Sequence, residues 1–242
     1  IVLEPKPGLY FNLVVLDFAS LYPSIIMNFN ISYETVRCRH EECRSNTPMN
    51  SPHWICRKRT GIESSIIGAL RELRVKYYQP LAKKTRDEEK RSFYDVVQRA
   101  IKVFINASYG VMGADSFHFY APCAAETVTW IGRGIFTELV ETAKALGIEV
   151  VYGDTDSIFL RNPKPEEVEK LIEFVRSRYS IELNIDKVYR YGVFSQRKKN
   201  YLGVTEDGNV DIKGLVGKKS STPKFVKQAF HEMVSILSKV RN

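Results

Sequence analysis

Three aspartates have the residue type and the setting that metal-dependent phosphoryl transfer requires. Asp17 ends the apolar run Leu13–Leu16, and Asp154 and Asp156 lie together in a Gly-Asp-Thr-Asp turn. Converging carboxylates repel one another unless a cation lies between them, and their hard oxygen atoms favour Mg²⁺ or Mn²⁺. The set therefore indicates phosphoryl transfer. From spacing alone an alternative stays open, in which the pair are ordinary turn residues and Asp17 caps a helix.

Strands must position these acids. Residues 8–18 are expected to form a buried strand that ends in Asp17, because a short apolar run here leads directly into the carboxylate. The β-rich runs 148–152 and 157–160 predict a hairpin with Asp154 and Asp156 at its tip. Both elements could deliver carboxylates to one edge of a sheet.

Two helices separate these strands in the chain. Helical periodicity predicts them over about 64–84 and 92–108, as an antiparallel pair joined by the charged stretch 83–91. On the second helix, one face is expected to pack and the opposite face to remain available for chemistry. The packing face comprises Phe93, Val97, Ala100 and Phe104, and the open face comprises Arg99, Lys102, Asn106 and Tyr109.

The remaining chain alternates helices and short strands around one long loop. Helices are expected near 21–29, 122–146, 165–180 and 223–240, strands near 187–194, 201–204 and 210–212, and a loop over 33–61. These patterns favour an α+β protein.

Composition limits the class of protein and its partners. The chain has 242 residues, with 36 Lys and Arg against 28 Asp and Glu, so its formal charge of +8 suits a polyanionic partner. It has no run of about 18 apolar residues, so no membrane span is predicted. A cytoplasmic, nucleoid-associated protein is expected. The first residue is Ile1 rather than Met, which indicates a piece of a longer protein.

Three segments resemble the motifs of one enzyme family. Asp17–Ile26 is similar to motif A of the family B (α-like) DNA polymerases, Lys102–Gly110 to motif B and Tyr152–Ser157 to motif C. Their order and length make the resemblance specific, and the sequence looks archaeal. Ala107 departs from the commoner Ser of motif B.

The resemblance implies an architecture. It implies a palm, which is an antiparallel sheet backed by helices, with an inserted two-helix fingers subdomain and the start of a thumb. The expected boundaries are palm 1–60, including a cysteine-containing loop, fingers 61–108, palm 109–216 and thumb 217–242. The family's N-terminal and 3′–5′ exonuclease domains and most of its thumb have no counterpart here. A sliding clamp is a candidate partner of the full enzyme.

The resemblance also implies a reaction and its residues. Asp17, Asp154 and Asp156 would be catalytic, with two Mg²⁺ ions, replaceable by Mn²⁺, held by Asp17, Asp156 and the Phe18 carbonyl. Nucleotide-binding residues would be Ser20, Leu21, Tyr22, Arg74, Lys102, Asn106 and Tyr109. Tyr22 matches the residue that excludes a ribose 2′-hydroxyl. The alternative to nucleotide binding by Arg74 is that it is an ordinary solvent-exposed charge on a helix.

Further residues match positions that contact primer–template DNA in the family. They are Gly110, Thr155, Lys198, Lys199, Tyr201, Lys213, Lys218 and Lys219. The expected function is template-directed transfer of a dNMP from a dNTP to a primer 3′-hydroxyl. One alternative is a non-catalytic DNA-binding subunit or fragment of a polymerase assembly. A reverse transcriptase or RNA polymerase is opposed by the form of motif C and by Tyr22.

Cysteines gather in the loop before the first long helix. Cys38, Cys43 and Cys56, with His40 and His53 nearby, offer ligands that could hold a structural Zn²⁺. The spacing, Cys-x4-Cys followed by His-x2-Cys, fits no standard zinc pattern closely, so zinc is the less favoured alternative to simple buried thiols.

Overall fold

The computed structural model describes residues 2–214 and 222–239, so Lys218 and Lys219 lie outside the described residues. The chain divides into two compact units. One comprises Ile1–Phe18, Phe136–Arg178 and Glu182–Asn242, and the other comprises Ala19–Ile135 and Tyr179–Ile181. The chain therefore passes from the first unit to the second between Phe18 and Ala19, directly after Asp17.

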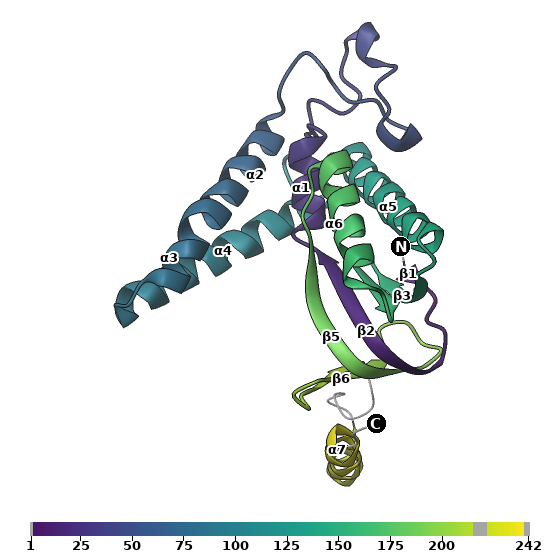
Figure 1. Cartoon of the computed structure of the whole chain (residues 1–242). Helices are drawn as coiled ribbons and strands as arrows, with labels where there is room; N and C mark the ends of the chain where they lie inside the picture. Colours follow the sequence, from purple (N-terminus) through teal and green to yellow (C-terminus); the bar gives the residue numbers. More distant parts are fainter. Residues whose placement is uncertain (1, 215–221, 240–242) are drawn as a thin grey trace. The chain divides into compact units, whose positions relative to one another are not determined.

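One antiparallel sheet dominates the first unit. Within the described residues it has seven strands in the order β1-β3-β4-β2-β5-β6-β7 (Figure 1). Their bounds are β1 Val2–Leu3, β2 Gly8–Phe18, β3 Glu149–Asp154, β4 Ser157–Arg161, β5 Leu183–Phe194, β6 Tyr201–Thr205 and β7 Val210–Lys213. The long β2 pairs with both β4 and β5, so segments far apart in sequence become neighbours at the centre of the sheet.

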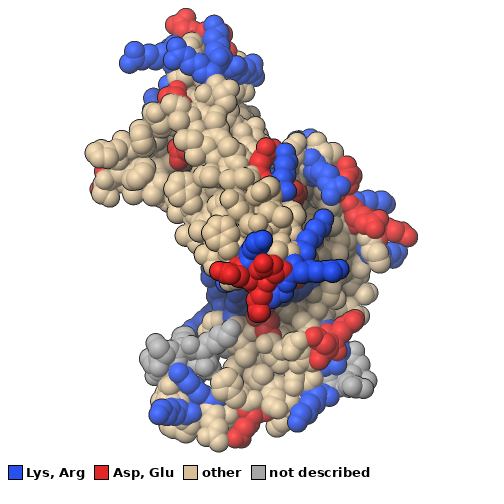
Figure 2. All heavy atoms as spheres, turned by 90° about the vertical axis from the view of Figure 1, so that its left-hand side faces the viewer, with Lys and Arg blue, Asp and Glu red and all other residues tan. Residues whose placement is uncertain are grey.

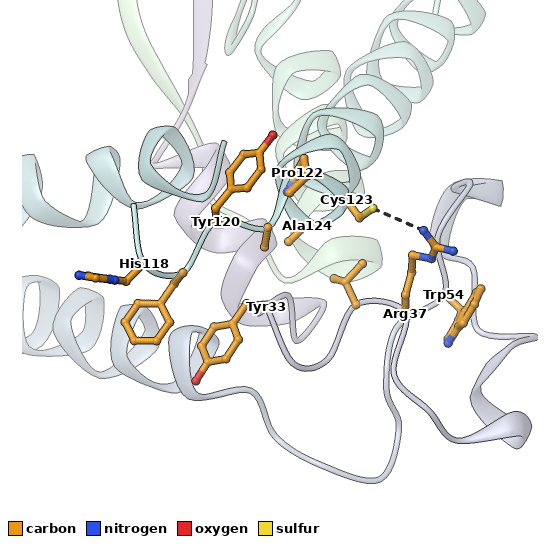
Figure 3. Close-up of a pocket in the computed structure, with 11 residues that line it drawn as sticks. Tyr33, Arg37, Trp54, His118, Tyr120, Pro122, Cys123 and Ala124 are labelled. Carbon is orange, nitrogen blue, oxygen red and sulfur yellow. Dashed lines mark hydrogen bonds between the residues drawn. The ribbon is translucent and has the colours of Figure 1, made fainter. Parts of the chain in front are cut away.

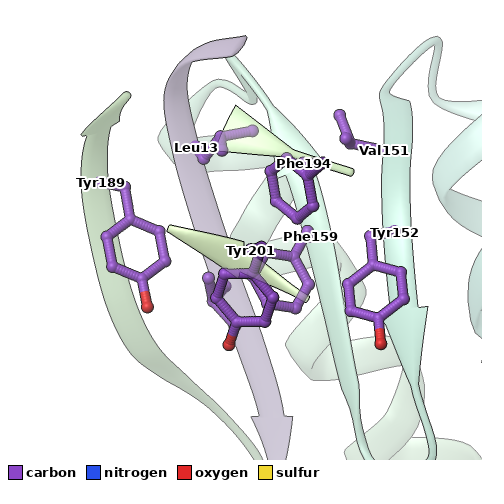
Figure 4. Close-up of a cluster of buried hydrophobic side chains, with 8 residues drawn as sticks. Leu13, Val151, Tyr152, Phe159, Tyr189, Phe194 and Tyr201 are labelled. Carbon is purple, nitrogen blue, oxygen red and sulfur yellow. The ribbon is translucent and has the colours of Figure 1, made fainter. Parts of the chain in front are cut away.

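Aromatic side chains fill much of the core on this sheet. Phe194 stacks on Tyr201 with ring centroids 5.4 Å apart, and Phe159 meets Phe194 edge-on at 5.5 Å. Tyr152 joins the same cluster, 5.3 Å from Phe159 (Figure 4). Ring pairs of this kind contribute about 0.5–1.5 kcal/mol beyond their buried area. They fix β3 and β4, the strands that carry the hairpin tip.

Helices bury apolar stripes in the same unit. α6 (Pro165–Tyr179) buries Val168, Leu171 and Val175 at helical spacing. The part of α5 (Pro122–Ala145) that belongs to this unit packs Phe136 against β3, where a side chain at Gly153 would lie 2.5 Å from the ring. α7 (Lys224–Lys239) contributes Val234 to a smaller cluster over β6 and β7. The fold is α+β, with an antiparallel sheet backed by helices.

The second unit is mainly helical. Its helices are α1 (Leu21–Asn28), α2 (Ile62–Glu72), α3 (Gln79–Lys84), α4 (Glu88–Met112) and the first half of α5. A π-helical turn, Leu73–Tyr78, joins α2 to α3, and α4 runs back beside them (Figure 1). Residues 33–61 form an irregular loop with short 3₁₀ turns at Glu41–Cys43 and Pro48–Asn50.

Two expectations for α4 were wrong. The helix begins at Glu88, because Asp87 caps it by accepting a hydrogen bond of 3.1 Å from the Lys90 N–H. Its buried residues are Ile105, Ser108 and Met112, whereas Phe93 and Phe104 are 58% and 59% exposed. The packing stripe differs from the predicted one, and α4 contacts α1 as well as α2 and α3. Among the described residues, none of the helices has the length and apolar character to cross a membrane.

Candidate active site

The strand register brings Asp17 to the hairpin that carries Asp154 and Asp156. Asp17 at the end of β2 and Asp154 at the end of β3 are both register partners of Ser157, the first residue of β4. The Phe18 N–H donates a 2.8 Å hydrogen bond to the Asp156 carbonyl. Asp17 lies 137 and 139 residues before Asp154 and Asp156, and the three acids share one end of three adjacent strands.

The hairpin tip has an uncommon backbone. Thr155 has φ of 41°, a left-handed value that β-branched residues rarely adopt, and the Asp156 N–H donates to the Asp154 carbonyl across it. Ser20, three residues after Asp17, also has a left-handed φ of 57°. Strain of this kind costs on the order of 1–3 kcal/mol per residue and is found at functional sites. Both motifs that carry acids contain it.

The charges at the tip are unequal. Asp154 forms an ion pair with Lys199, with Nζ and Oδ2 2.9 Å apart, and this carboxylate raises the pKa of Lys199. Asp156 as a whole residue is exposed to solvent, but its carboxyl group is partly shielded from solvent by surrounding protein atoms. That desolvation, with the charge of Asp154, outweighs its backbone hydrogen bond and the charge of Lys199, and raises its pKa. The Asp156 carboxyl group therefore lies where a negative charge is unfavourable.

These donors fit hard divalent cations. Carboxylate and carbonyl oxygens are the ligands that Mg²⁺ takes in proteins. Asp17, Asp156 and the Phe18 carbonyl could hold such ions. Asp154 already has a cationic partner in Lys199.

The Lys198–Tyr201 segment is tied to this end of the sheet. The Lys199 N–H donates to the Tyr152 hydroxyl at 2.9 Å, and Lys213 is the register partner of Tyr201. A side chain at Gly214 would lie 2.1 Å from the Lys199 carbonyl oxygen, so Gly214 must stay a glycine. Lys198, Lys199 and Lys213 are exposed. Tyr201 is only 9% exposed and belongs to the aromatic core, and burial raises its pKa.

In the second unit, motif A continues into α1. Ser20 precedes the helix, Leu21 is buried, and the half-buried Tyr22 ring lies 4.7 Å from that of Tyr109. A side chain at Gly132 of α5 would lie 3.2 Å from the Tyr22 ring. The absence of a side chain at that position therefore helps to set where Tyr22 lies.

The open face of α4 carries the predicted motif B residues. Lys102 and Asn106 are exposed one turn apart, and Gly110 is exposed one turn further. A Cβ at Gly110 would meet nothing within 4 Å, so packing does not require this glycine. Arg74, in the π-helical turn, is only 9% exposed and donates a 3.3 Å hydrogen bond to Gln98 of α4. Its burial, with the charge of Arg71, lowers its pKa.

Comparison with known proteins identifies a family. The chain matches the model of DNA polymerase family B over residues 1–241. The chain belongs to DNA polymerase family B. This family B chain is 50% identical to DNA polymerase 1 of Sulfurisphaera ohwakuensis, over 100% of its own length, and 47% identical to DNA polymerase 1 of Aeropyrum pernix, over 99%.

A solved structure is also similar to the family B chain. The family B DNA polymerase from the hyperthermophilic archaeon Pyrobaculum calidifontis matches it with a TM-score of 0.77 and 37% identity, over 100% of this chain. The chain spans 28% and 25% of the two archaeal relatives and 31% of the solved chain.

The family B chain also has a pocket that the sequence did not predict. It has a volume of about 580 Å³ and lies between the loop before α2 and the segment before α5 (Figure 3). Tyr33 stacks on Phe119 with ring centroids 4.9 Å apart, and Arg37 lies over the Trp54 ring. An Arg37 N–H donates to the Cys123 sulfur at 3.8 Å. Aromatic residues in an otherwise polar loop were the available signal.

Proposed function

We propose that this chain carries the catalytic centre of a template-directed DNA polymerase, which transfers a dNMP from a dNTP to the 3′-hydroxyl of a primer. The observation that carries the proposal is the register that brings Asp17 beside Asp154 and Asp156. Membership of DNA polymerase family B and the names of the archaeal relatives support it. The sheet would be the palm, α2 to α4 the fingers and α7 the start of the thumb.

The acids would divide two roles between them. Asp17, Asp156 and the Phe18 carbonyl would hold two Mg²⁺ ions, with Mn²⁺ as a substitute. When bound, these ions would favour deprotonation of the primer hydroxyl and neutralise the charge of the leaving pyrophosphate. Asp154 would be the third catalytic acid. Its ion pair with Lys199 supports a positioning and charge-balancing role rather than ligation.

Side chains of the second unit would bind the triphosphate. Lys102 is exposed on α4 and offers a mobile ammonium, and Asn106 offers an amide one turn later. Arg74 would supply a further cation, held in place by Gln98. The backbone N–H groups of Ser20, Leu21 and Tyr22 at the start of α1 suit phosphate oxygens, because the helix dipole favours negative charge at this end.

Tyr22 and its neighbours would select the nucleotide. The Tyr22 ring, supported by Tyr109 and by the close approach of Gly132, would lie under the sugar and exclude a 2′-hydroxyl. Gly110, which nothing in the fold requires, would leave room for the nascent base pair.

Cations of the first unit would hold the primer–template. Lys198, Lys199 and Lys213 would contact phosphates, with Lys218 and Lys219 beyond them in the chain, and Thr155 would approach the primer end. Tyr201 would act from the core, by fixing the segment that carries Lys198 and Lys199. Such contacts give salt-dependent affinity without sequence specificity.

Single-nucleotide extension of a primed template tests the proposal. The whole protein and its Asp156→Asn variant are compared with saturating Mg²⁺ and dNTP, while DNA binding is followed by fluorescence anisotropy. We expect the variant to bind DNA as the wild type does and to extend it about 1,000-fold more slowly or worse, because a carboxylate that acts mainly on the charged transition state is lost. Gln196→Ala, an exposed change near the same DNA-binding segment, is the matched control.

Two results would contradict the proposal. If wild type and variant extend the primer at the same rate, Asp156 has no catalytic role. If both bind DNA and neither extends it, the chain is a non-catalytic DNA-binding component instead.

A further inference from the structure

Four potential metal ligands converge in the irregular loop of the second unit. One ligand atom from each lies within 4.8 Å of all the others, and the four residues are Cys38, His40, Cys43 and Cys56. Cys56 Sγ and His40 Nδ1 are 3.4 Å apart. All three thiols are buried, and the four cysteines of the chain, all within the described residues, are free.

The separations fit the edges of a small tetrahedron. With Zn–S of about 2.3 Å and Zn–N of about 2.05 Å, tetrahedral zinc sets sulfur–sulfur distances of about 3.8 Å and sulfur–nitrogen distances of about 3.6 Å. The 3.4 Å contact between Cys56 and His40 and the 4.8 Å limit on the whole set lie around these values. Three sulfurs and one imidazole nitrogen complete the four-ligand shell of a structural zinc site with no ligand in excess.

The cluster contains four of the five candidate ligands that the sequence offered. His53 lies outside the cluster, because its ring forms a 2.8 Å hydrogen bond with Glu126 of α5. His40 is the imidazole of the cluster, so the ligand spacing is Cys-x-His-x2-Cys, followed by Cys56. A disulfide would use two of the three thiols and leave the third and the imidazole without a role.

Backbone donors surround the sulfurs, as they do in metal–thiolate sites. The Arg57 N–H donates to Cys43 Sγ at 3.4 Å. The backbone N–H groups of Lys58 and Arg59 also approach the Cys56 sulfur. Such outer contacts orient metal ligands and stabilise their charge.

The surface of the loop suits a thiolate centre. Zn²⁺ with three thiolates and one neutral imidazole carries one net negative charge. Six cations are exposed on this loop: Arg37, Arg39, Arg44, Arg57, Lys58 and Arg59. Figure 2 shows a group of Lys and Arg side chains at the top of its view. Only three acids, Glu34, Glu41 and Glu42, lie in the same described segment. A negative centre beneath this surface lowers the repulsion among its cations.

Few buried apolar side chains stabilise the loop. Between Tyr33 and Thr60, the buried apolar side chains other than the three cysteines are Val36 and Ile55. Its end is nevertheless fixed to the helices, because the Asn30 side chain donates to the carbonyls of Cys56 and Arg59 and accepts from the Gly61 N–H. A cross-link at Cys56 would therefore be transmitted to the first residue of α2.

We propose that this loop binds one structural Zn²⁺ through its buried sulfur and imidazole ligands. The ligands are Cys38, His40, Cys43 and Cys56. The ion holds the loop together and fixes the start of α2. It is separate from the Mg²⁺-binding acids and does not depend on the polymerase activity proposed above.

Metal analysis of the whole protein tests the proposal. The protein is purified without chelator, and its zinc content is measured by inductively coupled plasma mass spectrometry together with thiol alkylation under native conditions. We expect close to one zinc per chain, three thiols protected from alkylation, and loss of the zinc in Cys43→Ser. Cys123→Ser, which removes a half-buried thiol outside the cluster, is expected to keep it.

A second measurement holds even if Cys43→Ser does not fold. Wild-type protein refolded with Co²⁺ is expected to show the thiolate charge-transfer band and the intense visible bands of a tetrahedral cobalt site. Zinc-free protein with three reactive thiols would overturn the proposal. So would a disulfide within the cluster found by non-reducing mass analysis, or zinc that stays bound in Cys43→Ser. Loss of primer extension with zinc still bound would count against the proposed polymerase function alone.

Discussion

The acid end of the sheet and the cysteine loop place polar groups by opposite means. At the acid end, paired strands position Asp17, Asp154 and Asp156, and the aromatic core beneath them holds those strands without help from the acids. In the loop the order is reversed, since regular structure is sparse and the three cysteines are most of its buried apolar side chains.

The acids depend on the fold for their positions but contribute little to its stability, whereas the buried cysteines contribute to the stability of the loop that contains them. The raised pKa of Asp156 and the left-handed backbone at Thr155 and Ser20 are local costs at the acid end, and the surrounding structure tolerates them. Substitutions there should change activity more than stability. Substitutions in the loop should do the opposite.

Tyr22 offers the largest effect short of removing an acid. We expect Tyr22→Ala to raise ribonucleotide incorporation relative to deoxyribonucleotide incorporation about 100-fold, because the ring that would exclude a 2′-hydroxyl is gone. Primer extension with paired rNTP and dNTP concentrations measures the ratio. Tyr33→Ala, which removes an exposed ring from the cysteine loop, is the control. An unchanged ratio in Tyr22→Ala would remove sugar selection from this residue.

Gly110 gives a sharper separation of function from stability. Because a Cβ there meets nothing within 4 Å, Gly110→Ala should raise the free energy of unfolding by about 0.5–1 kcal/mol through its higher helix propensity. It should also slow primer extension about tenfold, since the added methyl group would occupy space left for the nascent base pair. Chemical denaturation and extension rates measure the two effects. A stabilised variant with full activity would show that Gly110 is not needed to leave space for the nascent base pair.

Glu63, in the first turn of α2 after the cysteine loop, makes the stability of this region depend on pH. Its burial in the first turn of α2, with the charge of Glu34 nearby, raises its pKa to about 7. The native state therefore holds a proton that the unfolded chain loses near pH 4.5, and this contribution to stability falls away as the pH rises from about 4.5 to 7. Glu63→Gln should flatten the decline in Tm by a few degrees over that interval. Parallel Tm profiles of the two proteins would contradict this.

The acid end could be predicted because it is encoded locally. The hairpin was expected over 148–152 and 157–160 and is observed as Glu149–Asp154 and Ser157–Arg161, since apolar runs and an acidic turn specify it without tertiary information. The antiparallel sheet backed by helices and the family were also predicted correctly.

What could not be predicted depends on which elements meet in space. The packing face of α4 was wrong because helical periodicity does not tell which side a neighbouring helix covers. His40 was not distinguished from His53 because the loop, rather than a repeat of spacing, brings His40 to the thiols. The burial of Tyr201 and the support of Tyr22 by Gly132 arise from contacts between distant segments.

One crossed measurement tests the central claim most directly: extension rate and Tm, determined on the same samples of Asp156→Asn and Cys43→Ser. Asp156→Asn should lose extension and, without Mg²⁺, unfold no earlier than the wild type, because a carboxylate with a raised pKa costs stability at neutral pH. Cys43→Ser should unfold several degrees earlier and extend primers normally below its own Tm. If the extension rate and the Tm both fall in both variants, activity and stability are not separated between the acids and the cysteine loop, which contradicts the central claim.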